Sequence, residues 1–342
     1  MSFASPPISL LKVVKVSGFM LVFLLLGMLG ALLLGTADVG LKDFLDLIFI
    51  GETKEETVRL IIFKIRLPRI ILAGLAGFTL SVGGTVFQAI LRNPLADPFI
   101  LGVSSGAAFG AVLGIVAGLG FGFGIPACAF AGAFTTIALV MLIARRKMGM
   151  ESATTLLAGV IVNAFFTAII MFFVATSTDD RLHTMLFWLY GDLSQSRMGE
   201  TLVALPVVAI GFALLYGFAN HLNLIAMGEE SALHMGVDVE KAKICCFLGV
   251  SLITGLIVSF TGLIGFVGLI VPHILRMLIG SDHRLLLPVA GLGGAIFLIW
   301  ADTLARTVVQ PSEIPVGVIT AALGAPFFIY LLRKRGGVRH WN

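Results

Sequence analysis

The chain has 342 residues, of which 58% are hydrophobic and 12% are charged, and its formal net charge is +4. Soluble domains are typically about 25% charged, so this composition excludes an ordinary soluble protein and indicates a membrane protein. The small, dispersed positive charge also argues against a nucleic-acid-binding protein, because no basic stripe is interleaved with aromatic residues. A helix needs about twenty apolar residues to cross the hydrocarbon core, and the chain offers about ten such runs.

These runs predict an all-α polytopic membrane protein with a single transmembrane domain, residues 1–342. In chain order they are 17–35, 67–90, 99–118, 124–144, 155–175, 201–219, 244–260, 263–280, 285–303 and 315–332. Only the glycine-rich stretch "SFTGLIGFVG" separates the seventh run from the eighth. The forty glycines of the chain predict helices that pack closely in lipid. The first run could instead be a signal peptide cleaved near Ala37, although it is longer than a typical apolar signal region.

The distribution of basic residues predicts the orientation of the chain. With the segment 1–16 inside, the inner segments carry fourteen Lys and Arg residues and the outer segments carry nine. Most of the outer ones lie in one long loop, 36–66, where charge counts for less in orientation. Both termini are therefore predicted to be cytoplasmic, with the break at 176–200 outside and the break at 220–243 inside.

The inner break 220–243 reads "NHLNLIAMGEESALHMGVDVEKAK" and is longer than a connector requires. Its residues Ala232, Leu233 and Met235 can form a small apolar patch, while the acidic residues around them stay in water. A short amphipathic helix of this kind rests on the membrane surface or on a partner protein. A plain connector is the alternative interpretation.

At the outer side, "RLPRI" places Arg66 and Arg69 on one side of a helix start, with Pro68 suited to the first turn. Arginine binds carboxylates bidentately, so an exposed pair would form a socket for acidic residues of a partner. The alternative is that both side chains reach towards lipid headgroups. Arg306, which follows the ninth run, either faces the outside or pairs with Asp302 four residues earlier.

The break "LRNPLADP" interrupts two apolar runs on the predicted inner side. Pro94 and Pro98 are expected to stop the helices. Asn93 and Asp97 are expected to satisfy the backbone groups that are freed there. Irregular backbone at membrane depth is tolerated only where protein or a water-filled cavity covers it.

Several activities are disfavoured by what the sequence contains. It has no G-x-x-x-x-G-K-[ST] motif for a nucleotide, so the chain itself is predicted not to be an enzyme that hydrolyses ATP. An ion-coupled secondary transporter would use carboxylates in mid-span, whereas the nineteen acidic residues lie at span ends or in breaks. The three cysteines lack metal-ligand spacing, and no metal site is predicted. His273 in "VPHILR" could suggest a haem ligand, but this is disfavoured because it lies at the predicted cytoplasmic end.

Several long stretches of the sequence carry a family resemblance. They are "IRLPRIILAGLAGFTLSVGGTVFQAILRNPLADPFILGVSSGA", "LLAGVIVNAF", "GEESALHMGV", "GFVGLIVPHILRMLIGSDHRLLLP" and "EIPVGVITAALGAPFFIYLL". Together, from about residue 59 to 335, they resemble the permease subunits of type II ABC importers for iron chelates, haem and cobalamin, the FecCD-type permeases. The resemblance implies a ten-helix fold in a bacterial or archaeal cytoplasmic (inner) membrane.

The resemblance also implies the partners and the activity. The first partner is a second permease copy, and a homodimer around a central pathway is favoured. The others are two cytoplasmic ATPase subunits, which bind ATP and Mg, and a periplasmic substrate-binding protein. The chain itself is expected to bind no cofactor and to move cargo by alternating access. The sequence resembles permeases for iron chelates, either a ferric siderophore or haem, more than permeases for cobalamin. Cobalamin remains the alternative cargo.

Residue roles follow from the same resemblance. Short coupling helices between the sixth and seventh spans would contact the ATPase through Gly228, Glu229, Ser231, Ala232, Met235 and Gly236. Docking of the binding protein would fall to Arg66, Arg69 and Arg306. The cytoplasmic gate would be formed by Asn93, Leu95, Ser152 and Ala153, with a plain turn as the alternative at Asn93 and Leu95. Ala153 departs from the hydroxyl pair expected there.

The fifth run is expected to line the pathway. Its residues Asn163, Phe166, Thr167 and Ile170 are predicted to share one helical face. The alternative for Asn163 is a hydrogen bond to a neighbouring helix within the membrane.

Overall fold

The computed structural model describes residues 8–35, 56–144 and 152–334, and within these ranges the chain is helical with no strand. The helices of the first half are α1 (Leu10–Leu33), α3 (Glu56–Leu60), the π-helical η1 (Ile61–Arg66), α4 (Leu67–Ile90), the 3-10 helix η2 (Pro98–Leu101), α5 (Val103–Val116), α6 (Gly124–Ala144) and α7 (Ser152–Thr176). Those of the second half are α8 (Asp179–Leu189), α9 (Met198–Gly217), α10 (Ala219–Met227), α11 (Glu229–His234), α12 (Val239–Thr261), α13 (Val267–Ile279), α14 (His283–Thr307) and α15 (Val316–Lys334).

Each predicted apolar run overlaps one of these helices, namely α1, α4, α5, α6, α7, α9, α12, α13, α14 and α15. Seven helices in the described residues are long and apolar enough to cross a membrane, whereas α5, α13 and the apolar part of α15 are shorter. At about 1.5 Å per residue, the 14 residues of α5 reach about 21 Å, which is less than the roughly 30 Å hydrocarbon core. The multi-pass character is thus confirmed, while ten full crossings stay a prediction.

Polar and glycine residues at the helix ends explain where the helices begin and stop. Asp238 and Asp282 cap the starts of α12 and α14, where their carboxylates accept hydrogen bonds from the backbone N–H of Lys241 and Arg284 at 3.1 and 3.0 Å. The predicted glycine-rich break between the seventh and eighth runs is confirmed, since α12 ends at Thr261 and α13 begins only at Val267. Gly262 follows α12 with a φ of 68°, a conformation that glycine adopts without strain.

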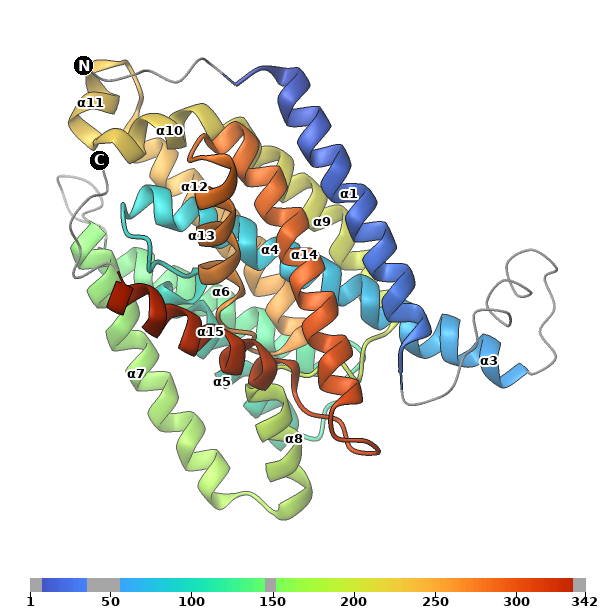
Figure 1. Cartoon of the computed structure of the whole chain (residues 1–342). Coiled ribbons are helices and arrows are strands. Elements are labelled where there is room, and N and C mark those ends of the chain that lie inside the picture. Colours follow the sequence, from blue (N-terminus) through green and yellow to red (C-terminus); the bar gives the residue numbers. More distant parts are fainter. Residues whose placement is uncertain (1–7, 36–55, 145–151, 335–342) are drawn as a thin grey trace.

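The core of the bundle is built around α4, which lies in the middle of Figure 1 with α14, α12 and α13 against it. α1 lies on the outside of the bundle, and most of its side chains are exposed in the isolated chain. α4 and α14 approach at backbone distance, because a Cβ added at Gly77 would overlap the carbonyl oxygen of Gly294. Gly84 meets the carbonyl of Gly268 on α13 in the same way. The close glycine packing predicted from the composition is therefore confirmed at these crossings.

The two ends of the bundle carry different features. The α10–α11 segment (residues 219–235) lies at the top left of Figure 1. The start of α4, the end of α14 and helix α8 lie towards the opposite end. These two ends carry the residues predicted to contact the ATPase and the binding protein, respectively.

Candidate functional site

The three arginines predicted for docking meet at one end of the bundle, where they form a cluster with two carboxylates. We call Arg66, Arg69, Asp302, Arg306 and Glu313 the arginine cluster. The guanidinium of Arg69 donates to both carboxylate oxygens of Asp302 at 3.0 and 3.1 Å, and to Glu313 at 2.7 Å. Arg306 lies 3.3 Å from Asp302 through its Nε atom, which confirms the pairing at four residues considered from the sequence.

The prediction that Arg66 and Arg69 form an exposed socket is wrong. Arg66 is 3% exposed, and Arg69 and Arg306 are each 5% exposed. The physical reason lies in α1, whose last carbonyl groups have no partner within the helix. Arg66 donates to the carbonyl oxygens of Leu32 and Leu33 at 2.6 and 3.2 Å.

Arg306 binds the same helix end, where it donates to the carbonyl oxygens of Ala31 and Leu34 at 3.4 and 3.5 Å. A positive charge is favourable at the C-terminus of a helix. The cluster therefore ties the end of α1 to the start of α4 and the end of α14. Glu313, whose side chain is 35% exposed, is its most accessible member.

The α10–α11 segment at the other end has a small core of its own. Ala232 is fully buried there, packed with Ile225, Val237 and Ala242. The prediction that Ala232 belongs to an exposed contact patch is therefore wrong, because its side chain faces inward on a helix of only six residues. The exposed apolar side chains of the segment are Met227, Leu233 and Met235.

The two glycines predicted for the ATPase contact have conformational roles. Gly228 separates α10 from α11 with a φ of 137°, and Gly236 follows α11 with a φ of 82°. Residues with a side chain adopt these angles only with strain. Ser231 is exposed, and Glu229 forms an ion pair with Lys243 at 2.6 Å instead of remaining free in water.

The break after α4 is a turn held by its own side chains. Asn93 accepts a hydrogen bond from the backbone N–H of Leu95 at 2.9 Å, and Asp97 accepts one from Phe99 at 2.9 Å, as expected. Pro98 begins η2 instead of ending a helix, which corrects the expected role of this proline. Burial raises the pKa of Asp97 to about 6.

The segment that follows the turn packs against α7, the helix that carries the second half of the predicted gate. η2 packs against α7, and Gly102 approaches the backbone of Gly159 on that helix. Ser152 and Ala153 form the start of α7, and Asn93 and Leu95 are exposed. The structure therefore packs the segment that follows the turn against α7, while a gate formed by Asn93, Leu95, Ser152 and Ala153 stays a prediction.

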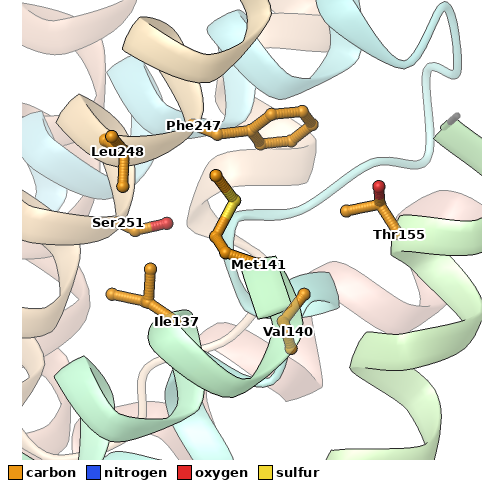
Figure 2. Close-up of a pocket in the computed structure, with 7 residues that line it drawn as sticks. All are labelled: Ile137, Val140, Met141, Thr155, Phe247, Leu248 and Ser251. Carbon is orange, nitrogen blue, oxygen red and sulfur yellow. The ribbon is translucent and has the colours of Figure 1, made fainter. Parts of the chain in front are cut away.

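A small recess lies next to the start of α7, between α6, α7 and α12 (Figure 2). Its lining is mostly apolar and includes Ile137, Val140, Met141, Phe247 and Leu248. Thr155 and Ser251 provide the only hydroxyl groups of the lining. With so little polar surface, the recess is not suited to bind a charged chelate.

The four residues of α7 predicted to line a pathway share one helical face but differ in exposure. Phe166 and Ile170 are buried within the chain, and the ring of Phe166 stacks on that of Phe109 at a centroid distance of 4.9 Å. Asn163 and Thr167 are exposed. Because α5 covers part of this face, only Asn163 and Thr167 remain available to a pathway, and pathway lining stays a prediction.

One group that the sequence analysis did not select lies at the start of α14. The amide of Asn223 on α10 binds both Asp282 and His283. The sequence signal for this group was "SDH", residues 281–283, which indicates the start of a helix. It does not indicate that Asp282 has a partner 59 residues away.

Comparisons with known proteins agree with the fold. The chain is 46% identical over 280 residues to the cobalamin import system permease protein BtuC of Halobacterium salinarum, with 82% of this chain and 75% of the relative covered. It is 38% identical over 331 residues to the hemin transport system permease protein HmuU of Yersinia pestis, covering 93% of this chain and 95% of the relative. A solved inward-facing structure of a metal-chelate type ABC transporter superposes with a TM-score of 0.82 at 31% identity and covers 94% of this chain and 99% of that one.

The profile of the FecCD transport family matches residues 21–334, which is nearly the whole described structure. The two relatives are named as permease proteins of import or transport systems, and the superposed structure has the same arrangement of helices along most of its length. The chain belongs to the FecCD transport family.

Proposed function

We propose that the chain is the permease subunit of an ATP-driven importer that takes an iron chelate, either a ferric siderophore or haem, from a periplasmic binding protein across the inner membrane by alternating access. The observation that carries this proposal is the family match over residues 21–334. The hemin transport relative supports this cargo class. Cobalamin is the second candidate, because the cobalamin import relative is 46% identical to this chain over 280 residues.

The energy source in this proposal lies outside the chain. Two ATPase subunits, which bind ATP and Mg, contact the α10–α11 segment through the exposed apolar residues Met227, Leu233 and Met235. Such exposed apolar side chains on a surface segment are typical of a protein interface. Glu229 and Ser231 border this patch and complete the contact.

The outer end receives the loaded binding protein. Because Arg66, Arg69 and Arg306 are buried, they serve docking by holding α1, α4 and α14 in register instead of presenting free guanidinium groups. The exposed side chains of Arg59 and Lys64, which precede α4, supply the accessible positive charge there. A second copy of the permease completes the pathway, with Asn163 and Thr167 of each copy available to line it.

The test is uptake into proteoliposomes that contain the chain, its ATPase and its binding protein. Radiolabelled ferric siderophore, hemin and cobalamin are offered separately, with ATP or with a non-hydrolysable analogue inside. ATP-dependent uptake of an iron chelate supports the proposal, and uptake of cobalamin alone selects the second candidate. Uptake that continues without ATP but follows an ion gradient would establish a secondary transporter and overturn both.

A further inference from the structure

Helix α14 has a polar cluster at each end. Asp282 caps its start, and Asp302 lies near its end within the arginine cluster. Twenty residues of helix correspond to about 30 Å. Figure 1 shows α14 extending from the α10–α11 end of the bundle to the opposite end.

The amide side chain of Asn223 links the start of α14 to α10 by hydrogen bonds, beside the apolar contacts between these helices. Asn223 donates from Nδ2 to the carboxylate of Asp282 at 3.0 Å, and its Oδ1 accepts from the backbone N–H of His283 at 2.8 Å. The ring Nδ1 of His283 lies 2.7 Å from the same oxygen. Because that oxygen has no proton to give, the ring nitrogen is the donor. Asn223 thus joins two successive residues of α14 through three hydrogen bonds.

Two further contacts hold this helix start in place. Arg284 binds the carboxylate of Asp282 through its Nε atom at 3.0 and 3.2 Å, and this hydrogen bonding lowers the pKa of Asp282 to about 2. Pro288 has no N–H group, so the carbonyl of Arg284 loses its usual helical partner. Tyr216 of α9 replaces that partner, and its hydroxyl donates to the Arg284 carbonyl at 3.2 Å.

The body of α14 is packed so closely against α4 that the two helices cannot easily slide past each other, and they are expected to move together. Gly294 lies against the backbone of Gly77, and a Cβ at Gly291 would overlap the ring of Phe78. Close-packed helices move as units because their contacts cannot deform continuously. A displacement at one end of α14 is therefore carried to the arginine cluster at the other.

From this arrangement we infer that Asn223 is a positioning residue that fastens the α10–α11 segment to α14, so that movement of this segment shifts α14 and the arginine cluster together. This inference rests on the proposed function, in which the ATPase moves the α10–α11 segment. Asn223 itself contacts neither cargo nor ATPase in this scheme. It determines how much of the ATPase movement reaches the outer end.

Three variants and a control separate this role from general stability. Asn223→Ala removes all three hydrogen bonds. Asn220→Ala changes the same residue type on the same helix, where the side chain is exposed, and is the matched control. Asn223→Asp combined with Asp282→Asn exchanges the amide and the carboxylate, which restores a donor–acceptor pair across the junction. Asn223→Asp alone places two carboxylates together and is expected to act like the alanine variant.

The first measurement is hydrogen exchange of the full-length chain in nanodiscs. Asn223→Ala is expected to speed exchange of the α10–α11 amides by about tenfold or more, since three hydrogen bonds are lost and each contributes a factor of several. Asn220→Ala and the exchanged pair are expected to match the wild type. Unchanged exchange in Asn223→Ala would overturn the inference, whatever the chain transports.

The second measurement is cargo imported per ATP hydrolysed, in the proteoliposomes described above with hemin as the probe. Asn223→Ala is expected to lower this ratio by about 2- to 30-fold, with ATP hydrolysis continuing, and the exchanged pair is expected to restore it. A normal ratio in Asn223→Ala overturns the inference while the proposed function stands. A wild type that imports none of the offered cargoes with ATP overturns the proposed function, and the exchange experiment then decides the link between α10 and α14 by itself.

Discussion

Replacing Asp302 by Asn tests whether the arginine cluster is a buried network or a set of surface charges. The Asp302 side chain is 1% exposed and lies within 3.0 to 3.3 Å of the guanidiniums of Arg69 and Arg306. Removal of one partner from a buried ion pair costs about 3–5 kcal/mol, because the remaining charges stay buried without compensation. Asp302→Asn is therefore expected to lower the free energy of unfolding by about 3–5 kcal/mol.

Glu313→Gln is the matched control. It removes one negative charge from the same cluster and from the same arginine, Arg69. Its side chain is 35% exposed, however, and an ion pair in contact with water contributes up to about 1 kcal/mol. The two variants change the formal charge equally, so the expected difference of about 2 kcal/mol or more comes from the burial of Asp302 and from its second arginine partner, Arg306.

The assay is reversible unfolding of the full chain in mixed micelles with increasing SDS, with helix content as the signal. Asp302→Asn should unfold at a clearly lower SDS fraction than Glu313→Gln. Equal shifts for the two variants would refute the argument that burial sets the strength of this cluster. A stability unaffected by Asp302→Asn would show that the ion pairs contribute nothing to the fold.

Three further predictions concern packing, pH and the inner end. Gly294→Leu is expected to lower the free energy of unfolding by at least about 1–3 kcal/mol, because the new side chain overlaps α4. Gly18→Ala, where the added methyl group meets open space, should change that free energy by less than about 1 kcal/mol. Equal melting temperatures for the two variants would contradict this prediction. The pKa of Asp97 is about 6 in the fold and 3.8 in the unfolded chain, so stability is lost as pH rises from about 4 through 6. Asp97→Asn should remove this loss in melts between pH 5 and 7.5. Leu233→Asp should weaken ATPase binding at least about tenfold in pull-down titrations. The melting temperature of the chain should not change, because Leu233 is exposed. Unaltered binding would exclude this patch as the ATPase contact.

The helices of this protein were predictable because their signals are local. Long apolar runs predict membrane helices, and Asp238 and Asp282 mark where two of them start. The helix start expected at Pro68 is wrong, because the helical segment that contains Pro68 already begins at Glu56. The side-chain caps of Asn93 and Asp97 in the turn after α4 were likewise expected from neighbouring residues. These features depend on contacts within a few positions, which the sequence displays directly.

Which face of a helix is covered was not predictable in the same way. Helical spacing grouped Asn163 with Phe166, but the packing of α5 on α7 buries one and leaves the other exposed. Ala232 was expected on the surface and fills a small core instead. Spacing defines which residues lie near one another on a helix, whereas burial depends on neighbours that the spacing does not identify.

The sequence by itself therefore determined the membrane class, the helices and their ends, and through family resemblance the kind of transporter. Only the tertiary structure decided the state of its charged groups. Arg66 is buried because it caps α1 from 34 residues away, and Arg69 because Asp302 lies 233 residues further along the chain. The neutral, partly buried Asn223 likewise finds its partner Asp282 59 residues away. A charge can be buried only where a partner compensates the loss of water, and partners this distant in sequence are brought together only by the packing of the whole bundle.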